Sequence, residues 1–397
     1  MVIEPKVRGF ICTTAHPEGC KRNVLNQIDY ARAHKSSVTA APRALILGGS
    51  TGYGLASRIA LAYSAGASTI SVAYDKPSSG TRTATAGWYN TAAFENAAQS
   101  DGLYAKSVNG DAFSNEIKDE VIDIIRRDLG KIDIIVYSLA SPVRVDPTDG
   151  VRYNSVIKPR GESFSNKSID VNARTVIDAN LEPATDEETR ATVKVMGGED
   201  WLLWISALKN AGVLADNVTT VAYSYIGPDV THAIYRSGTI GAAKLHLERT
   251  AQEITEALRD INGHGFVSVN KALVTQASSA IPVVPLYISI LYKVMKALGL
   301  HEGCIEQMVR LMNEHILASN PHICADGLIH VDDLEMRPDV QASVMSAWDK
   351  ICTANLERLS DLDGYRDDFY KLFGFCVPGV DYSADVDPAV AIPSITV

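Results

Sequence analysis

Residues 44–75 constrain the fold of this chain more than any other segment. The apolar run 44–47 is followed by Gly48-Gly49-Ser50-Thr51-Gly52-Tyr53-Gly54, a helix-like stretch to Gly66, and a second apolar run that ends at Asp75. Strand, glycine-rich turn, helix, strand and carboxylate follow in the order of a dinucleotide-binding βαβ unit. Glycines let the backbone turn sharply and approach a pyrophosphate, whose charge the helix N-terminus stabilises. We therefore predict that this turn binds a dinucleotide and that Asp75 accepts hydrogen bonds from its ribose.

Strands and helices alternate along the next stretch of chain. After a polar loop at 76–87, the pattern predicts a helix near 90–99, a strand at 104–108, a helix at 114–129 and a buried strand at 132–137. This alternation predicts a doubly wound parallel Rossmann-type sheet with helices on both faces. Ligands bind beyond the carboxyl ends of such strands, where the glycine-rich turn, Asp75, Asp111-Ala112 and residues 138–141 all fall. No second turn of this kind occurs, so we expect no flavin site of the same type.

The remaining residues are predicted to add to this core. We expect one large Rossmann-type domain over 1–397, with an N-terminal extension at 1–40, a dinucleotide-binding core at 41–275 and a substrate-covering helical part at 276–397. Residues 142–192 are rich in charge, Asn and Pro, and predict an irregular excursion within an insertion at about 143–215. Strands are predicted at 217–225 and 265–269, and helices at 241–260, 304–315, 339–355 and 364–372. The apolar segment 280–300 contains two prolines and two lysines, which favours a buried or pocket-lining helix over a membrane span.

Charge and cysteine placement narrow the possible partners. The net charge is −10, the pI is about 5.4, and no Lys/Arg-rich run is present, so nucleic-acid binding is not expected. The six cysteines are scattered without C-x-x-C pairs, which is typical of reduced thiols in a cytoplasmic protein. His16, Cys20 and Cys12 lie close together in sequence but lack a second ligand pair, so no metal site is predicted.

Tyr235 and Lys244 are candidates for catalysis. Short-chain reductases usually place Tyr and Lys four positions apart on one helix face. Nine positions on a continuous helix would turn about 900° and place these two on opposite faces, so a joint role requires Tyr235 to lie before the helix. The stretch 237–241 holds Ser, Thr and two glycines, which can delay the helix start. The spacing alone also fits a loop tyrosine and a solvated lysine; the position after the strand 217–225 favours the functional interpretation.

The chemistry of hydride transfer explains why this pair is suited to the task. Lys244 can hydrogen-bond the nicotinamide ribose and lower the cost of charge on a neighbouring phenol. Tyr235 can donate to an oxyanion that develops on the substrate. Tyr225, at the end of the strand, is a second phenol near the predicted site.

These motifs together resemble one family along almost the whole chain. The opening residues 5–17, the turn 48–58, the stretch Gly197-Gly198-Glu199-Asp200-Trp201 and the pair Tyr235-x₈-Lys244 resemble the trans-2-enoyl-CoA reductase (NADH) family, the FabV-type enoyl-ACP reductases of the short-chain dehydrogenase/reductase superfamily. The resemblance implies that Tyr235 is the proton donor, Lys244 binds the cofactor and Tyr225 contacts substrate. It implies cofactor contacts from Gly48, Gly49, Ser50, Thr51, Gly52, Tyr53, Tyr74, Asp75, Asp111, Ala112, Leu139, Ala140, Leu273, Val274 and Thr275. Asp75 disfavours a ribose 2′-phosphate, so NADH is expected as the cofactor.

We accordingly expect an oxidoreductase that reduces the C2=C3 bond of a trans-2-enoyl thioester, carried by CoA or by acyl-carrier protein, in fatty acid synthesis or elongation. A 3-oxoacyl thioester carbonyl reductase using the same Tyr and Lys is the alternative enzyme, and a non-catalytic NAD-binding sensor is the alternative from another class. The insertion and the C-terminal additions would obstruct the usual tetramer surfaces, so we expect a monomer.

Overall fold

A parallel sheet forms the centre of the molecule, described here by a computed structural model of residues 1–9, 11–318 and 322–395. Its strands lie in the order β13-β12-β11-β6-β3-β4-β5. In chain order they are β3 (Arg43–Leu47), β4 (Ser68–Ala73), β5 (Ala105–Asn109), β6 (Ile132–Tyr137), β11 (Leu214–Ser224), β12 (His264–Val269) and β13 (Ile329–His330). All six neighbouring pairs in it are parallel. The predicted sheet is confirmed, and β13 is an edge strand that the sequence pattern did not reveal.

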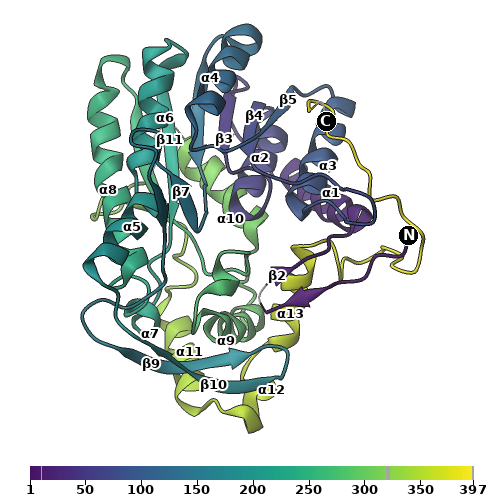
Figure 1. The fold of residues 1–397 in the computed structure, drawn as a ribbon, viewed down its shortest axis with the longest axis vertical. Coiled ribbons are helices and arrows are strands. Elements are labelled where there is room, and N and C mark those ends of the chain that lie inside the picture. The colour runs from purple at the N-terminus through teal and green to yellow at the C-terminus, as the bar shows by residue number, and fades with distance from the viewer. Residues whose placement is uncertain (10, 319–321, 396–397) are drawn as a thin grey trace.

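Helices cover both faces of the sheet (Figure 1). One layer holds α1 (Pro17–Ala33), α2 (Gly52–Ala65), α3 (Ala86–Ser100) and α10 (Cys304–Leu311), and the other holds α4 (Asn115–Ile124), α5 (Asp186–Met196), α6 (Glu199–Asn210) and α8 (Thr239–Ala257). Each layer closes its own apolar core against one side of the strands. The doubly wound architecture predicted from the alternation is thereby confirmed.

The chain reverses its direction of travel across the sheet after β5. From β3 it proceeds outward to β4 and β5, and then returns to β6, which pairs with β3 on the other side. The segments after β3 and β6 therefore leave neighbouring strands on opposite faces, and a crevice opens between them at the carboxyl ends. Predicted site residues follow β3, β4, β5, β6 and β11, so they are gathered along this one edge.

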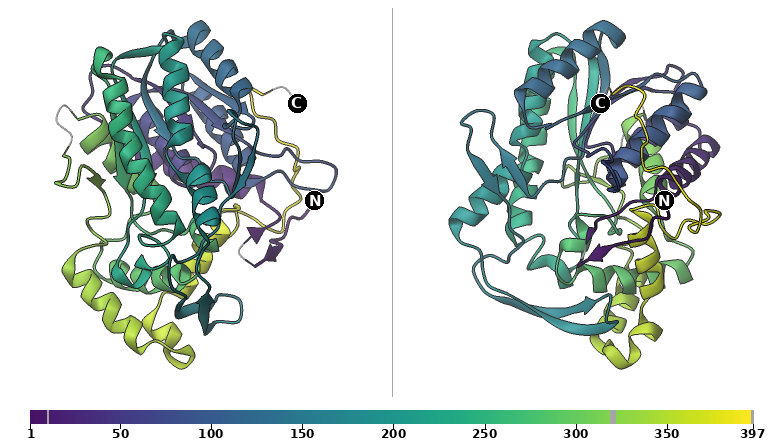
Figure 2. Two further views of the ribbon diagram at one scale, coloured as in Figure 1. Left: turned by 60° about the vertical axis from the view of Figure 1, so that its left-hand side comes forward. Right: turned by 45° about the vertical axis from the view of Figure 1, so that its right-hand side comes forward.

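A third group of elements lies beyond the carboxyl ends of the strands (Figures 1 and 2). It consists of α9 (Val284–Ala297), α11 (Pro338–Lys350), α12 (Leu356–Leu359), α13 (Leu362–Lys371) and the hairpin of β9 (Phe164–Asp170) and β10 (Thr175–Leu181), with the short α7 (Asp229–His232) beside them. α9 corresponds to the predicted apolar helix, and most of its residues are buried. No helix among the described residues is both long and apolar enough to span a membrane.

Residues 142–192 leave the central sheet, as predicted, but the expectation that they are irregular was wrong. This stretch contains two antiparallel hairpins, β7 (Val143–Val145) with β8 (Arg152–Asn154) and β9 with β10, before α5 begins at the predicted Asp186. Short strands with many polar residues carry a weak sequence signal because few of their side chains pack against apolar neighbours. Here Phe164, Val176 and Leu181 are partly buried against the core that includes α9.

The two ends of the chain also join the fold. β1 (Val7–Arg8) pairs with β2 (Ile11–Cys12); Phe10, part of the opening motif, lies outside the described residues. The C-terminal tail crosses the outer side of β5, where the Ser394 hydroxyl accepts the Ser107 N–H at 2.9 Å and donates to the buried carboxylate of Glu95 at 2.7 Å. An edge strand covered in this way is protected against pairing with other chains.

A buried ion pair ties the loop after β5 to α6. The Lys118 ammonium donates to Asp200 at 3.0 Å and to the carbonyl oxygens of Ala112 and Phe113 at 3.3 and 2.8 Å. The Trp204 indole N–H donates to the same Ala112 carbonyl at 2.9 Å. The motif that contains Asp200 therefore holds the Asp111-Ala112 loop in place.

We expect Lys118→Met to lower the free energy of unfolding by roughly 3–5 kcal/mol, because it leaves the Asp200 carboxylate buried without its cation. Urea unfolding followed by circular dichroism measures the change. The control is Lys21→Met, which breaks an exposed pair with Glu18 (3.4 Å) and should cost about 0–1 kcal/mol. Equal shifts for the two variants would show that the buried pair is not what stabilises this loop.

Candidate active site

The turn after β3 approaches the end of β6 so closely that side chains are excluded. Gly48 has φ +87° and a Cβ there would lie 2.4 Å from the Ser138 carbonyl oxygen, while a Cβ on Gly54 would lie 2.0 Å from the Gly48 oxygen. The N-cap residue of α2, Thr51, makes no side-chain capping bond, so the first N–H groups of α2 are not satisfied by that side chain. This geometry fits a pyrophosphate placed between the turn and the helix N-terminus.

Asp75 follows β4, and only one of its two carboxylate oxygens accepts a hydrogen bond from the described residues. Thr85 donates to Oδ1 at 2.7 Å, whereas Oδ2 is buried without a partner among the described residues. A Cβ on Gly87 would lie 2.5 Å from both oxygens, so only glycine leaves room beside the carboxylate. Burial raises the pKa of Asp75, and the hydroxyl groups of Thr85 and Ser50 beside the carboxylate oppose that shift. A buried acceptor without a donor fits the ribose hydroxyls of a dinucleotide.

The other predicted cofactor residues divide into two groups. Tyr74, Asp111 and Ala140 are exposed at the ends of β4, β5 and β6, and Leu139 and Thr275 are partly exposed at the same edge, where a ligand could reach them. Tyr53 instead points into the protein, where its hydroxyl donates to the Lys271 carbonyl at 2.6 Å. Its side chain thus ties α2 to the segment 271–275, which includes the buried Leu273 and Val274.

Tyr235 and Lys244 occupy the arrangement that a joint role requires. α8 begins at Thr239, so Tyr235 lies in the turns before it and Lys244 in its second turn. The Lys244 ammonium donates to the Tyr223 carbonyl at 2.7 Å, which holds it at the end of β11. The Tyr223 ring in turn lies edge-on to Tyr53 of the glycine-rich segment, at 6.1 Å. Lys244 is therefore linked by contacts to the predicted cofactor turn.

Burial shifts the pKa values of both side chains toward their uncharged forms. Burial lowers the pKa of Lys244 to about 8, opposed by nearby Glu248. Burial and the charge of Glu335 raise the pKa of Tyr235, and no hydrogen bond from the described residues contributes to that shift. Tyr235 is therefore a protonated phenol with a hydroxyl free to donate.

Tyr225 leads to charged groups that the sequence analysis missed. Its ring lies edge-on to that of Tyr235, with centroids 4.7 Å apart, and its hydroxyl donates to Glu335 at 3.1 Å. Glu335 is fully buried and Lys271 is 2% exposed; burial raises the pKa of Glu335, and the charge of Lys271 opposes that shift. Neither residue belongs to a motif, and Glu335 is separated from Tyr225 by more than a hundred residues, so sequence offered no signal for them.

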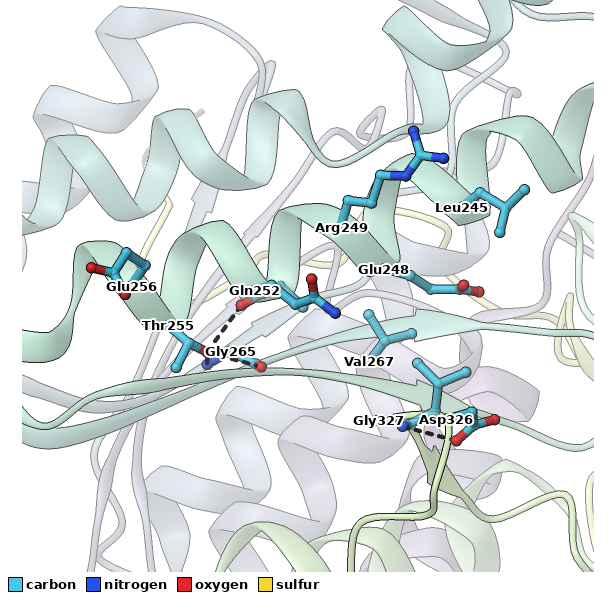
Figure 3. Close-up of a pocket in the computed structure, with 12 residues that line it drawn as sticks. Leu245, Glu248, Arg249, Gln252, Thr255, Glu256, Gly265, Val267, Asp326 and Gly327 are labelled. Atoms are coloured by element: carbon cyan, nitrogen blue, oxygen red, sulfur yellow. Dashed lines mark hydrogen bonds between the residues drawn. The ribbon is translucent and has the colours of Figure 1, made fainter.

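Two other features lie away from this site. His16 is buried, and its Nδ1 accepts the Gly19 N–H at 3.2 Å as the N-cap of α1, so its placement is that of a capping residue. A cavity of about 380 Å³ opens between α8, β12 and the turn 326–328 (Figure 3). None of the predicted site residues lines it.

Three family models match consecutive segments of the chain. A model described as the NAD(P)H binding domain of trans-2-enoyl-CoA reductase matches residues 2–80, and one described as the trans-2-enoyl-CoA reductase catalytic region matches residues 82–317. A third, described as an enoyl reductase FAD binding domain, matches residues 325–386.

The description of the third model implies a flavin, which residues 325–386 do not fit. They form β13, a turn, α11, α12, α13 and a tail, and the turn between β13 and α11 contains no glycine. The buried carboxylate in that turn, Glu335, is already bonded to protein groups. The segment therefore lacks the close backbone approach that a dinucleotide turn provides.

Relatives match over the whole length of the chain. Enoyl-[acyl-carrier-protein] reductase [NADH] of Coxiella burnetii (strain CbuG_Q212) is 57% identical, covering 100% of this chain and 98% of its own. Trans-2-enoyl-CoA reductase [NADH] of Ruminiclostridium cellulolyticum is 53% identical, covering 100% of both chains. The crystal structure of Treponema denticola trans-2-enoyl-CoA reductase in complex with NAD superposes with a TM-score of 0.94 at 48% identity, covering 97% of this chain and 98% of its own. With the matching models, the same sheet and the same motifs, the chain belongs to the trans-2-enoyl-CoA reductase family.

Proposed function

We propose that this protein catalyses the NADH-dependent reduction of the C2=C3 double bond of a trans-2-enoyl thioester to the saturated acyl thioester. The observation that supports the proposal is that Lys244 and Tyr235, with eight residues between them, both contact residues at the end of β11. The Lys244 ammonium donates to the Tyr223 carbonyl, and the Tyr235 ring packs against the Tyr225 ring. Relatives of this chain are named as NADH-dependent enoyl-ACP and trans-2-enoyl-CoA reductases, which supports the same reaction.

In the proposed reaction, each residue has one task. Bound NADH supplies the hydride that reduces C3 of the substrate. Tyr235 hydrogen-bonds the thioester oxygen, where negative charge develops as the hydride adds to C3. As the proton donor, Tyr235 then supplies the proton that, added at C2, completes the saturated product. Lys244, when protonated, binds the nicotinamide ribose and lowers the cost of charge beside Tyr235. Asp75 accepts hydrogen bonds from the adenosine ribose, and α9 forms a wall for the acyl chain.

We also propose the acyl carrier, the oligomeric state and the cellular location. CoA and acyl-carrier protein are both candidate carriers, since relatives are named for each. The extra hairpins and C-terminal helices support a monomer, and six cysteines without disulfides support a reducing, cytoplasmic location.

Steady-state oxidation of NADH tests the reaction. We expect turnover with crotonyl-CoA and with longer enoyl-CoA substrates, and a fall in kcat of at least about 100-fold in Tyr235→Phe with NADH binding retained, because one oxyanion donor is removed. Tyr104→Phe is the control: it deletes a phenol bonded to Asp128 (2.6 Å) before β5, away from the carboxyl ends, and should keep full activity. Turnover with acetoacetyl-CoA alone would favour the carbonyl reductase, and no turnover of either would favour the sensor.

The pH profile tests Lys244. Since the lysine must be protonated to donate, and burial lowers its pKa to about 8, kcat/KM for NADH should fall as pH rises through about 8. Below that pH the profile should be flat with respect to this group. Lys244→Met should remove the basic limb and lower kcat/KM at pH 7. Because Lys271 has a similar pKa, a limb that persists in Lys244→Met would assign it to another group.

Cofactor choice tests Asp75. Asp75→Ser should lower kcat/KM for NADH about tenfold and raise the NADPH/NADH ratio of kcat/KM by at least about tenfold, since the carboxylate no longer repels a ribose 2′-phosphate. Asp119→Asn, an exposed carboxylate on α4, is the matched loss of one negative charge and should leave the ratio unchanged. An unchanged ratio in Asp75→Ser would refute this role.

A further inference from the structure

Glu335 joins three elements of the candidate site from a turn outside the sheet. The turn lies between β13 and α11, in the segment that follows the catalytic-region match. The carboxylate is fully buried, and it accepts hydrogen bonds from the end of β11, from the segment 271–275 and from α9.

Three hydrogen bonds from the described residues reach this carboxylate. Oε1 accepts from the Tyr225 hydroxyl at 3.1 Å and from the Tyr287 hydroxyl at 2.7 Å, and Oε2 accepts from the Ala272 N–H at 2.6 Å. All three partners donate to Glu335. Burial raises the pKa of this carboxyl group, and the charge of Lys271 and the hydrogen bonds from Ala272 and Tyr287 oppose that shift and favour the carboxylate. A phenol has a single hydrogen, and that of Tyr225 is thereby committed to Glu335.

The hydrogen bond from Tyr225 to Glu335 limits which phenol can donate to the substrate. While its hydroxyl hydrogen is donated to Glu335, Tyr225 has no hydrogen left to donate to a thioester oxygen. The adjacent Tyr235, whose ring lies edge-on at 4.7 Å, has no competing hydrogen bond from the described residues. The two phenols are thus made unequal by one buried carboxylate, and a single donor faces the developing charge.

We propose that Glu335 is a positioning residue for the enoyl thioester reduction: by accepting the Tyr225 hydroxyl it fixes that ring, and the ring fixes Tyr235 as the sole phenol that donates to substrate. The same carboxylate accepts the Ala272 N–H, directly before the predicted cofactor-binding segment 273–275. This role rests on the proposed function, because it is defined by the reaction that Tyr235 serves.

A double-mutant cycle of Glu335→Gln and Tyr225→Phe tests the role, with kcat for crotonyl-CoA reduction, NADH affinity and the unfolding midpoint measured for each variant. The amide keeps the shape of the side chain but replaces one acceptor oxygen with a donor. We expect each single change to lower kcat about three- to tenfold, the effect of one net hydrogen bond. If the two residues act together, the kcat of the double variant should lie within about a factor of two of the kcat of the less active single variant. Tyr235→Phe should lower kcat by at least about 100-fold. Tyr104→Phe, the control that removes another phenol bonded to a carboxylate, should leave kcat unchanged.

Each other result has a defined meaning. If the two losses multiply, or if Glu335→Gln matches Tyr104→Phe, Glu335 does not act through Tyr225 and the proposal is overturned. If Tyr225→Phe loses as much as Tyr235→Phe, both phenols donate, which also overturns it. Should Glu335→Gln fail to fold, the comparison of Tyr225→Phe with Tyr235→Phe still decides the question. An inactive wild-type protein would instead refute the proposed function.

Discussion

The close approach of two backbone segments at the centre of the sheet determines where the site can form. The turn after β3 and the end of β6 lie so near each other that a Cβ at Gly48 would meet the Ser138 carbonyl oxygen at 2.4 Å. Because β3 and β6 leave the sheet toward opposite faces, this contact closes the base of the crevice. Glycine at these positions keeps side chains out of the space before the N-terminus of α2, where we propose that the cofactor pyrophosphate binds.

Buried charges hold the rim of the crevice from outside the sheet. The Lys118–Asp200 pair fixes the loop after β5 from α6, while Glu335 and Lys271 connect the end of β11 to the segments that cover it. Isolated buried charges cost several kcal/mol, so each of these groups is stable only with its partners in place. The C-terminal part therefore belongs to the site: its Glu335 completes the surroundings of Tyr225 and Tyr235. The segment matched by a model named for FAD contributes this carboxylate and shows no dinucleotide turn of its own.

Sequence reasoning succeeded where local pattern and local structure coincide. The glycine spacing, the apolar strands and the periodic helix at 114–129 predicted β3, α2, β4, α4 and β6, because each is specified by its own residues. It failed at β13 and at the hairpins β7–β8 and β9–β10, whose few buried side chains depend on distant packing. Tyr53 was predicted as part of the cofactor turn, and the structure adds that its hydroxyl donates to the Lys271 carbonyl. A side-chain direction of this kind is decided by the element packed against it.

By itself, the sequence determined the parallel sheet, the glycine-rich turn with its carboxylate, and the need for Tyr235 to precede the helix that carries Lys244. These follow from backbone geometry over a few residues: glycine alone tolerates the turn, and nine helical positions separate two side chains onto opposite faces. Only the tertiary structure decided which charges surround the two tyrosines. Glu335 is more than a hundred residues from Tyr225 in sequence, and its carboxylate reaches the phenol because β13 returns the chain to the sheet edge beside β12. Burial by the covering helices then sets the low pKa of Lys244 and the protonated state of Tyr235, since desolvation depends on all the neighbours that packing brings together.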